Sequence, residues 1–297
     1  MKEPVTAVVP ACNRKEATLR TLAVIASCDP APVEVIVHID GGNNEMEQAI
    51  QAAHPAVKIL KSDQLLGPGG SRNALVHAAQ TKWVANFDDD SFPETPDYFA
   101  RIQRLVNIEP LAAMFSAASQ PSETQFPGLM RLGVFSGCGC VYNKEWFMKT
   151  QGYVPLPIAY CMEEVDLSLQ LHALGGIMVH DPELRVVHDR KPVTTPDEVL
   201  HAGIIANTAL LPFLRFPIYL WPVGLLQLAS RIVASVRAGW HAGLLAGIFS
   251  IPRHLFRHRR FRKTESGTAV ISWLILRRSM HPLVAGGPRS LVQDPTS

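Results

Sequence analysis

Short apolar runs alternate with helical segments along residues 1–90, and this alternation limits the possible folds more than any other feature of the chain. The runs are rich in β-branched residues and too short for helices, so they are expected to be buried strands. Strands that alternate with helices predict a parallel sheet in an α/β domain. The expected strands are Val5–Val9, Glu34–Ile39, Val57–Leu60 and Trp83–Phe87, and the expected helices cover residues 15–27, 45–53 and about 71–80.

Polar residues follow three of these strands, at the points where the strands end. The carboxyl ends of parallel strands lie at one edge of the sheet, and ligands bind beyond that edge in open α/β sheets. We therefore expect the three groups of polar residues to share one site. The groups are Pro10–Arg14, Asp40 and Asp88–Asp90.

The consecutive carboxylates of Asp88, Asp89 and Asp90 repel one another at the end of a buried strand. A divalent cation or the hydroxyl groups of a ligand would explain them, because Mg2+ and Mn2+ take oxygen ligands. The alternative is a solvated acidic turn that caps a helix starting near Pro96. These three residues alone leave both interpretations open.

A glycine-rich loop, Gly67–Asn73, precedes the third expected helix. It lacks both the GxGxxG and the GxxxxGK[ST] spacing, so it predicts neither a dinucleotide fingerprint nor a P-loop. One interpretation places its backbone amides and Arg72 near a diphosphate at the helix start. The other treats it as a flexible loop in which Ser71 is the N-cap of the helix.

A second acidic group, Glu163, Glu164 and Asp166, stands at the start of an expected helix that ends at Gly175. Leucines recur at helical spacing between residues 167 and 174, which predicts one apolar face. Acidic residues at a helix N-terminus are favoured by the helix dipole, and this is the structural interpretation. The functional interpretation is a carboxylate at the edge of the site that acts as a general base.

Further short strands are expected between residues 110 and 190. His188 ends the last of them and becomes a candidate metal ligand if the aspartates face it. Trp146 and Asp166 are candidates for contact with an acceptor, although packing in the core is the alternative for Trp146. Glycines within residues 136–140 allow either a close approach of a ligand or a crowded core strand. The expected strands are Leu111–Ala118, Val134–Tyr142, Ile177–His180 and Leu184–His188.

The charge of the chain is divided unevenly, although its net charge is only +2. Residues 1–200 hold 16 Lys and Arg against 24 Asp and Glu, whereas residues 201–297 hold 12 against 2. A basic C-terminal region suits an anionic surface, either lipid or nucleic acid. Because no recognised nucleic-acid-binding module accompanies it, we expect no nucleic-acid partner.

The basic C-terminal region contains two uncharged stretches, residues 216–230 and 238–252, each 15 residues long. Crossing a bilayer takes about 20 residues, so we expect helices that lie on the membrane surface rather than span it. Residues 253–263 add six Lys or Arg, which would contact anionic headgroups. A helical cap on the α/β domain is the alternative.

Cysteines and the start of the chain bear on the cellular compartment. The five cysteines form no CxxC pair and are odd in number, so neither a zinc site nor a disulfide framework is indicated. The chain enters its first strand without the apolar core of a signal peptide. We therefore expect a cytoplasmic protein that is peripherally associated with the inner face of the cell membrane.

Taken in order, these motifs resemble those of the inverting glycosyltransferases of family 2, which have the GT-A fold. The resemblance covers about 190 residues and points to the rhamnosyltransferase-like enzymes of bacterial cell-surface polysaccharides. It implies a Rossmann-like mixed sheet flanked by helices, followed here by the helical, membrane-associating appendage. The motifs are VVPACNR, HIDGG, GPGGSRN, NFDDDS, MEEVDLSLQLHALGG and VVHD.

The resemblance also implies a nucleotide-sugar donor, a lipid-linked or glycan acceptor, and Mn2+ or Mg2+ as cofactor. By position, Asp90 and His188 would bind the metal, and Glu164, preceded by Glu163, would be the catalytic base. The remaining matched positions would contact the donor: Pro10, Asn13, Arg14, Asp40, Arg72, Asp88 and Asp89.

Three positions depart from the family pattern, and they leave the base of the donor nucleotide undetermined. Glu164 stands where an aspartate is usual, Cys12 replaces an aromatic residue, and Asp40 is a single aspartate where the family has two. We expect a catalytic domain over residues 1–200, a membrane-associating region over 201–265, and a C-terminal segment over 266–297 with a poorly ordered tail. A metal-dependent nucleotidyltransferase and a non-catalytic carbohydrate-binding protein are the alternative functions, and a homo-oligomer is also considered.

Overall fold

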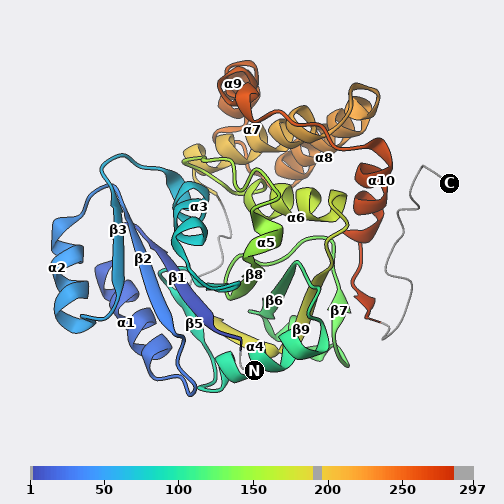
Figure 1. The fold of residues 1–297 in the computed structure, drawn as a ribbon. Helices are drawn as coiled ribbons and strands as arrows, with labels where there is room; N and C mark the ends of the chain where they lie inside the picture. Colours follow the sequence, from blue (N-terminus) through green and yellow to red (C-terminus); the bar gives the residue numbers. More distant parts are fainter. Residues whose placement is uncertain (1–2, 190–195, 284–297) are drawn as a thin grey trace.

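The computed structural model of the protein describes residues 3–189 and 196–283 (Figure 1). Its centre is a mixed sheet in which the strands are ordered β10-β7-β9-β6-β8-β4-β1-β2-β3, with β5 paired to β9. The strands are β1 Val5–Ala11, β2 Glu34–Asp40, β3 Lys58–Ser62, β4 Trp83–Asn86, β5 Ser91–Pro93, β6 Met114–Ala118, β7 Met130–Arg131, β8 Cys140–Asn143, β9 Met178–His188 and β10 His281–Pro282.

The N-terminal part of the sheet has the predicted parallel arrangement. Strand β1 pairs in parallel with β2 on one side and with β4 on the other, and β2 pairs in parallel with β3. Strand β8 then runs antiparallel to both β4 and β6, which makes the sheet mixed. The predicted α/β fold is confirmed, and the carboxyl ends of β1, β2 and β4 meet at one edge.

Helices cover both faces of this sheet, and each face has its own apolar core. The alternating side chains of β1 divide between the two, so that Val9 packs with one core and Val8 with the other. On the first face lie α1 Lys15–Ala26, α2 Asn44–Ala53 and α4 Tyr98–Ile108. On the second face lie α3 Gly67–Ala78, α5 Lys144–Phe147 and α6 Glu163–Ala173.

Three local predictions are corrected by the structure. Helix α3 begins at Gly67 rather than at Ser71, because Asp40 at the end of β2 accepts hydrogen bonds from the first amides of the helix. Residues 134–139 form a loop instead of the first part of a strand. The two strands expected over residues 177–188 are one strand, β9, whose pairing with β6 shifts register after Ala117.

The C-terminal helices pack beside α6, at the top of Figure 1. Apolar residues of α7 and α10 share a third core with the loop before α6. Trp273 is fully buried there, and its indole nitrogen donates a hydrogen bond to the carbonyl of Gly133 at 2.7 Å. The helices are α7 Glu198–Arg215, α8 Trp221–Arg237, α9 Leu244–His258 and α10 Gly267–Leu276.

The last predicted segment is more structured than expected. Residues 267–276 form α10, and β10 pairs with β7 at the edge of the sheet. The poorly ordered tail was predicted after about residue 280, and residues 284–297 lie outside the described residues. The predicted boundary at residue 200 falls within the first turn of α7.

One helical segment of this region is longer than its uncharged stretch suggested. A 3-10 turn runs directly into α8, so that Ile218–Arg237 makes 20 continuous helical residues. Within the described residues it alone is long and apolar enough to cross a membrane, and 11% of its apolar window is buried. The expectation that no stretch here has spanning length is therefore wrong for this segment.

Candidate active site

A cavity of about 630 Å³ opens at the carboxyl ends of β1, β2 and β4. The predicted common site of the three polar groups is therefore present in the structure. Most of the residues proposed from the sequence line it: Pro10, Arg14, Asp40, Arg72, Asp88, Asp89, Asp90, Glu163, Glu164 and His188.

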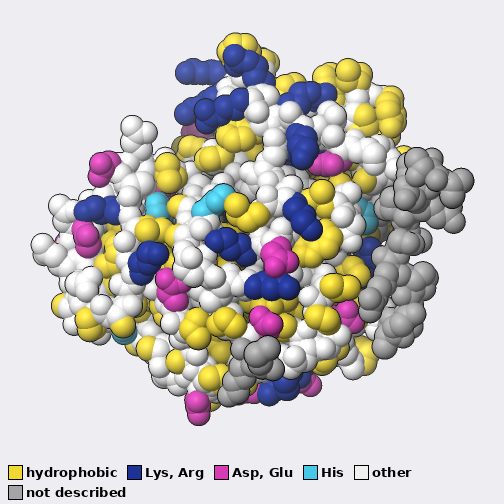
Figure 2. All heavy atoms as spheres, viewed as in Figure 1, with side chains coloured by type: hydrophobic (Ala, Val, Ile, Leu, Met, Phe, Trp, Pro, Cys, Tyr) yellow, Lys and Arg dark blue, Asp and Glu magenta, His cyan; other side chains and the backbone are white. Residues whose placement is uncertain are grey.

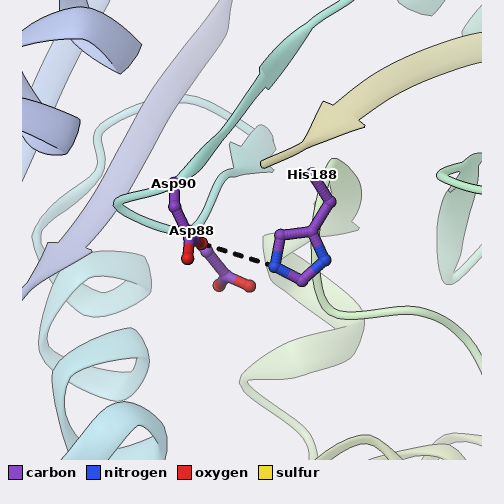
Figure 3. Close-up of side chains that lie close together, drawn as sticks. All are labelled: Asp88, Asp90 and His188. Carbon is purple, nitrogen blue, oxygen red and sulfur yellow. Dashed lines mark ion pairs between the residues drawn. The ribbon is translucent and has the colours of Figure 1, made fainter. Parts of the chain in front are cut away.

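The carboxylates of Asp88 and Asp90 and the imidazole of His188 lie close together in this cavity (Figure 3). One ligand atom from each residue lies within 4.8 Å of the others. The two aspartates belong to the turn between β4 and β5, and His188 ends β9, which pairs with β5 so that His188 stands opposite Ser91. Two distant segments therefore meet through a short antiparallel ribbon.

This group has the donor atoms of a divalent metal site. Two carboxylates suit Mn2+ or Mg2+, and the imidazole nitrogen favours the transition metal Mn2+ over Mg2+, which prefers oxygen ligands. The three atoms are close enough to share one ion. The Nε2 atom of His188 lies 3.3 Å from an Asp90 oxygen, and this contact and Cys138 raise the pKa of His188 to about 10. Asp88, which was assigned to the donor, belongs to the candidate metal group as well.

Arg14 balances the negative charges of Asp89 and Asp90 in the aspartate turn. Its guanidinium donates to Asp89 at 3.0 Å and also to Asp90. Burial is the largest influence on Asp89 and raises its pKa to about 6, whereas the Arg14 charge acts in the opposite direction. The like charges of the turn are thus held together by a cation from the end of β1.

Arg72 joins the aspartate turn to the start of α6. It is 4% exposed and donates to Asp88 at 2.6 Å and to Glu163 at 2.7 Å, while its guanidinium lies 5.8 Å from the centre of the Tyr153 ring. Its Nε atom and one Glu163 oxygen are buried without a hydrogen-bond partner. Arg72 is therefore part of a fixed bridge, and its predicted contact with the donor stays a prediction.

Glu163 and Glu164 occupy different environments, although they are neighbours. Glu163 is buried and paired with Arg72, whereas the nearest approach of Arg72 to a Glu164 oxygen is 3.9 Å. Burial and the adjacent Glu163 charge raise the pKa of Glu164 to about 7. A carboxylate with such a pKa is suited to accept a proton near neutral pH, so Glu164 is the better base of the two.

The loop before β8 makes room for Glu164. A Cβ atom on Gly137 would lie 2.2 Å from a Glu164 oxygen, so a larger residue here would displace the Glu164 carboxylate. The glycines of residues 136–140 thus allow the close approach of a side chain of the protein itself. Gly137 also lines the cavity.

Asp40 is already engaged within the fold. One of its oxygens accepts hydrogen bonds from Ser62 and from the Leu66 amide, and the other accepts one from the Gly67 amide at 2.9 Å. Asp40 fixes the start of α3 through these bonds. Its predicted contact with a nucleotide base stays a prediction.

Three predicted contacts lie away from the cavity. Asp166 is buried and bound by Arg215 at 2.5 and 2.9 Å, so its assignment to the acceptor is wrong. Trp146 packs against the second core, and the centre of its ring lies 4.5 Å from the Lys149 ammonium, so the packing alternative describes its contacts. Its contact with an acceptor stays a prediction. Asn13 is exposed, has φ 56, and is absent from the residues that line the cavity.

The sequence did not indicate several residues that line the cavity. They come from two loops without a recognisable motif, and only their approach in space identifies them. Cys161 has φ 64, a left-handed conformation that turns the chain into α6. These residues are Ser119, Gln120, Pro157, Ile158, Ala159, Tyr160 and Cys161.

Comparison with known proteins agrees with this arrangement. Residues 6–153 match the model of the family described as Glycosyl transferase family 2. The chain is 34% identical over 104 residues to the succinoglycan biosynthesis protein ExoO of Rhizobium meliloti (strain 1021). That match covers 34% of this chain and 28% of the curated relative, so it spans less than a third of the relative's length.

Solved structures share the fold at low sequence identity. The mannosyltransferase PcManGT from Pyrobaculum calidifontis, solved with GDP-Man and Mn2+, superposes with a TM-score of 0.56 at 17% identity, over 94% of this chain and 86% of that one. Residues 1–349 of S. aureus TarS, solved with UDP-GlcNAc, superpose with a TM-score of 0.56 at 12% identity, over 86% and 92%. GalNAc-T7, solved with UDP, GalNAc and Mn2+, gives 0.57 at 13% identity, over 73% and 49%. The sheet and its flanking helices therefore form a GT-A fold.

Proposed function

Because the chain is an enzyme of glycosyl transferase family 2, we propose that it moves a sugar from a nucleotide-diphosphate sugar to a hydroxyl group of a lipid-linked or cell-surface glycan. The observation that carries the proposal is one cavity that combines a metal-type group, Asp88, Asp90 and His188, with a separate carboxylate, Glu164. A nucleotidyltransferase or a non-catalytic carbohydrate-binding protein is no longer needed to explain these residues. The rhamnosyl specificity suggested by the motifs stays a prediction.

In the proposed reaction, Glu164 accepts the proton of the acceptor hydroxyl as that oxygen attacks the anomeric carbon. The new bond joins the acceptor oxygen to this carbon, and the bond from the carbon to the diphosphate oxygen breaks. Attack from the face opposite the leaving group is a single displacement, which inverts the anomeric configuration. The raised pKa of Glu164 supports this role, because a base with a pKa near the working pH transfers protons efficiently.

Asp88, Asp90 and His188 would hold the metal ion. Such an ion supplies positive charge that stabilises the leaving diphosphate. Around it, Arg72 fixes Asp88 relative to Glu163, so that the metal group and the base-bearing helix keep a constant separation. Arg14 orients Asp89 and Asp90 through its own ion pairs with them.

The C-terminal helices support a location at the membrane surface. Large apolar side chains of α8 and α9 are exposed, and the Lys and Arg of residues 253–263 gather beside them at the top of Figure 2. Exposed apolar groups next to cations are typical of helices that bind anionic lipid surfaces. We place the enzyme on the cytoplasmic face of the cell membrane, where Leu245, Phe249 and Phe256 of α9 would enter the interface.

The proposal is tested by donor turnover. A panel of nucleotide-diphosphate sugars is incubated with the full chain and Mn2+ or Mg2+, and release of the nucleoside diphosphate is measured. Asp90→Asn is expected to lower the rate by at least about 100-fold, because loss of a ligand should exceed the effect of losing an outer-shell partner. Asp63→Asn, an exposed aspartate away from the cavity, is the matched control. Full activity of Asp90→Asn would overturn the proposal.

A further inference from the structure

A second cavity, of about 670 Å³, lies between α7, α8, α10 and the start of α6. Its walls on α7 and α8 carry apolar side chains, Leu211, Val223 and Leu226 among them, beside polar ones such as Thr208 and Gln227. Arg231 of α8, together with Arg277 and Arg278 just after α10, also lines it. The cavity thus combines apolar side chains with three guanidinium groups.

These three arginines lack the partners that the arginines of the first cavity have. Within residues 3–189 and 196–283, no acidic side chain lines the second cavity and none of the three forms an ion pair. Burial and the charges of Arg231 and Arg278 lower the pKa of Arg277, which reflects the crowding of like charges. A ligand with several anionic oxygens would relieve this repulsion, and guanidinium groups match phosphate geometry well.

The second cavity adjoins the first. Cys161 lines both, and the Arg231 guanidinium lies 3.7 Å from its sulfur. At the start of α6, Glu164 faces the first cavity and the next residue, Val165, faces the second. A molecule held by the arginines could therefore extend past Cys161 towards the proposed base.

The apolar wall continues onto the surface of α8. Leu226 lines the cavity and is 71% exposed, and Leu225 beside it is 66% exposed. This same helix belongs to the segment that is long and apolar enough to cross a membrane. A hydrocarbon chain that leaves the cavity along α8 would meet apolar side chains rather than water.

We propose that the second cavity binds the phosphate or diphosphate group of a lipid-linked acceptor. Its long hydrocarbon chain would lie on α8, and its sugar would reach Glu164 past Cys161. The proposal rests on the proposed transferase function and names the class of acceptor: a phosphate or diphosphate ester of a long-chain alcohol that carries the sugar. The charge of the arginines selects the phosphate, and the exposed leucines select the chain.

Binding by calorimetry tests this assignment. Farnesyl diphosphate is the probe for the lipid phosphate, and farnesol and inorganic diphosphate are its two separate halves. We expect farnesyl diphosphate to bind more tightly than either half, and Arg231→Gln/Arg278→Gln to weaken it about tenfold or more. Arg259→Gln/Arg260→Gln removes the same charge from the exposed basic stretch and is expected to change the affinity less than about twofold. Both substituted pairs are exposed, and thermal unfolding verifies the fold.

The readouts separate this proposal from the transferase function. The rate of donor hydrolysis, in which water accepts the sugar, should be the same in Arg231→Gln/Arg278→Gln as in the unaltered chain. These residues lie outside the first cavity. If Arg231→Gln/Arg278→Gln and the unaltered chain bind farnesyl diphosphate equally well, the acceptor site is overturned. The transferase function is unaffected by that result as long as donor turnover is observed. Inorganic diphosphate that bound as tightly as farnesyl diphosphate would also overturn the acceptor site. The same holds if phosphatidylglycerol vesicles occupied the second cavity and farnesyl diphosphate did not. Absence of any donor turnover would instead contradict the transferase function.

Discussion

The two cavities use charge in opposite ways. In the first, each cation meets a carboxylate: Arg14 pairs with Asp89 and Asp90, and Arg72 pairs with Asp88 and Glu163. In the second, three arginines line the cavity beside apolar and neutral polar side chains, without an acidic partner in the described part of the chain. Paired charges hold side chains in place before a ligand arrives, whereas unpaired charges are free to bind an anion from outside.

Each region holds a residue that departs from this pattern, and the two residues indicate where function and structure are joined. In the first cavity, Glu164 is held loosely, with its nearest Arg72 atom 3.9 Å away. Arg215 is the one cation among the described residues of α7–α10 that forms an ion pair, and its partner, Asp166, lies two residues after Glu164. The helix that carries the proposed base is thus fixed from the C-terminal region.

The largest expected effect comes from Glu164, the loosely paired acid. Glu164→Gln should lower kcat by about 10²- to 10⁴-fold, the usual contribution of a general base. Glu163→Gln is the contrasting variant, because it breaks the buried pair with Arg72 and should lower thermal stability as well as activity. Steady-state kinetics and thermal unfolding of both variants provide the measurements. A Glu164→Gln enzyme with unchanged kcat would remove Glu164 as the base.

The next effect concerns Arg215, the paired cation of the C-terminal region. Arg215→Met leaves Asp166 buried without its partner, so the free energy of unfolding should fall by about 3–5 kcal/mol. Adding Asp166→Asn removes the uncompensated charge and should recover part of this loss. Urea unfolding of the unaltered chain and the two variants measures both values. If the double variant is less stable than Arg215→Met, the pair does not act through charge.

A smaller effect is expected for the exposed basic stretch. Arg259→Gln/Arg260→Gln should weaken partition onto anionic vesicles about 30-fold, at about 1 kcal/mol for each cation. Lys58→Gln/Arg104→Gln is the matched control, since those exposed cations pair with Glu34 and Asp97 of the α/β part. Vesicle sedimentation measures the partition. Equal losses in both double variants would mean that net charge, rather than this stretch, directs binding.

The last expected effect is a pH dependence, which is small near neutral pH. The base must be deprotonated, so kcat should be half-maximal near pH 7 and fall about tenfold per unit at lower pH, following the pKa of Glu164. A raised pKa also means that the stability contributed by Glu164 is present below its usual 4.5 and is lost as pH rises through about 7. Glu164→Gln should therefore gain stability relative to the unaltered chain over this window. Thermal unfolding at pH 4 and pH 8 compares them, and an equal difference at the two values would contradict the assignment.

The sequence was informative where function depends on residues close together in the chain. The parallel strands, the aspartate turn and the base-bearing helix follow from local patterns, and the rule that ligands bind at strand ends gathered them into one site. The pairing of His188 with Asp90 was expected from family position, and β5 and β9 bring the two together.

The rest depends on contacts between distant residues, which local patterns do not contain. Asp166 was expected to face an acceptor because nothing near it in sequence reveals Arg215, 49 residues later. Helix α3 starts earlier than predicted because Asp40, rather than Ser71, accepts the hydrogen bonds of its first amides. The second cavity is built from residues between 161 and 278 that share no motif. Burial and charge pairing in three dimensions decided each case.

The ribbon of β5 and β9 gives the candidate metal site an unusual sensitivity to changes in chain length. Along the last part of β9, Leu184 and Val186 are buried, Arg185 and Val187 are exposed, and the half-buried His188 lies on the same face as Leu184 and Val186. Because side chains alternate between the two faces of a strand, removal of one residue here would turn the imidazole to the opposite face. Point substitutions on the exposed face leave this alternation intact. A one-residue insertion or deletion within the ribbon would therefore remove His188 from the candidate metal site.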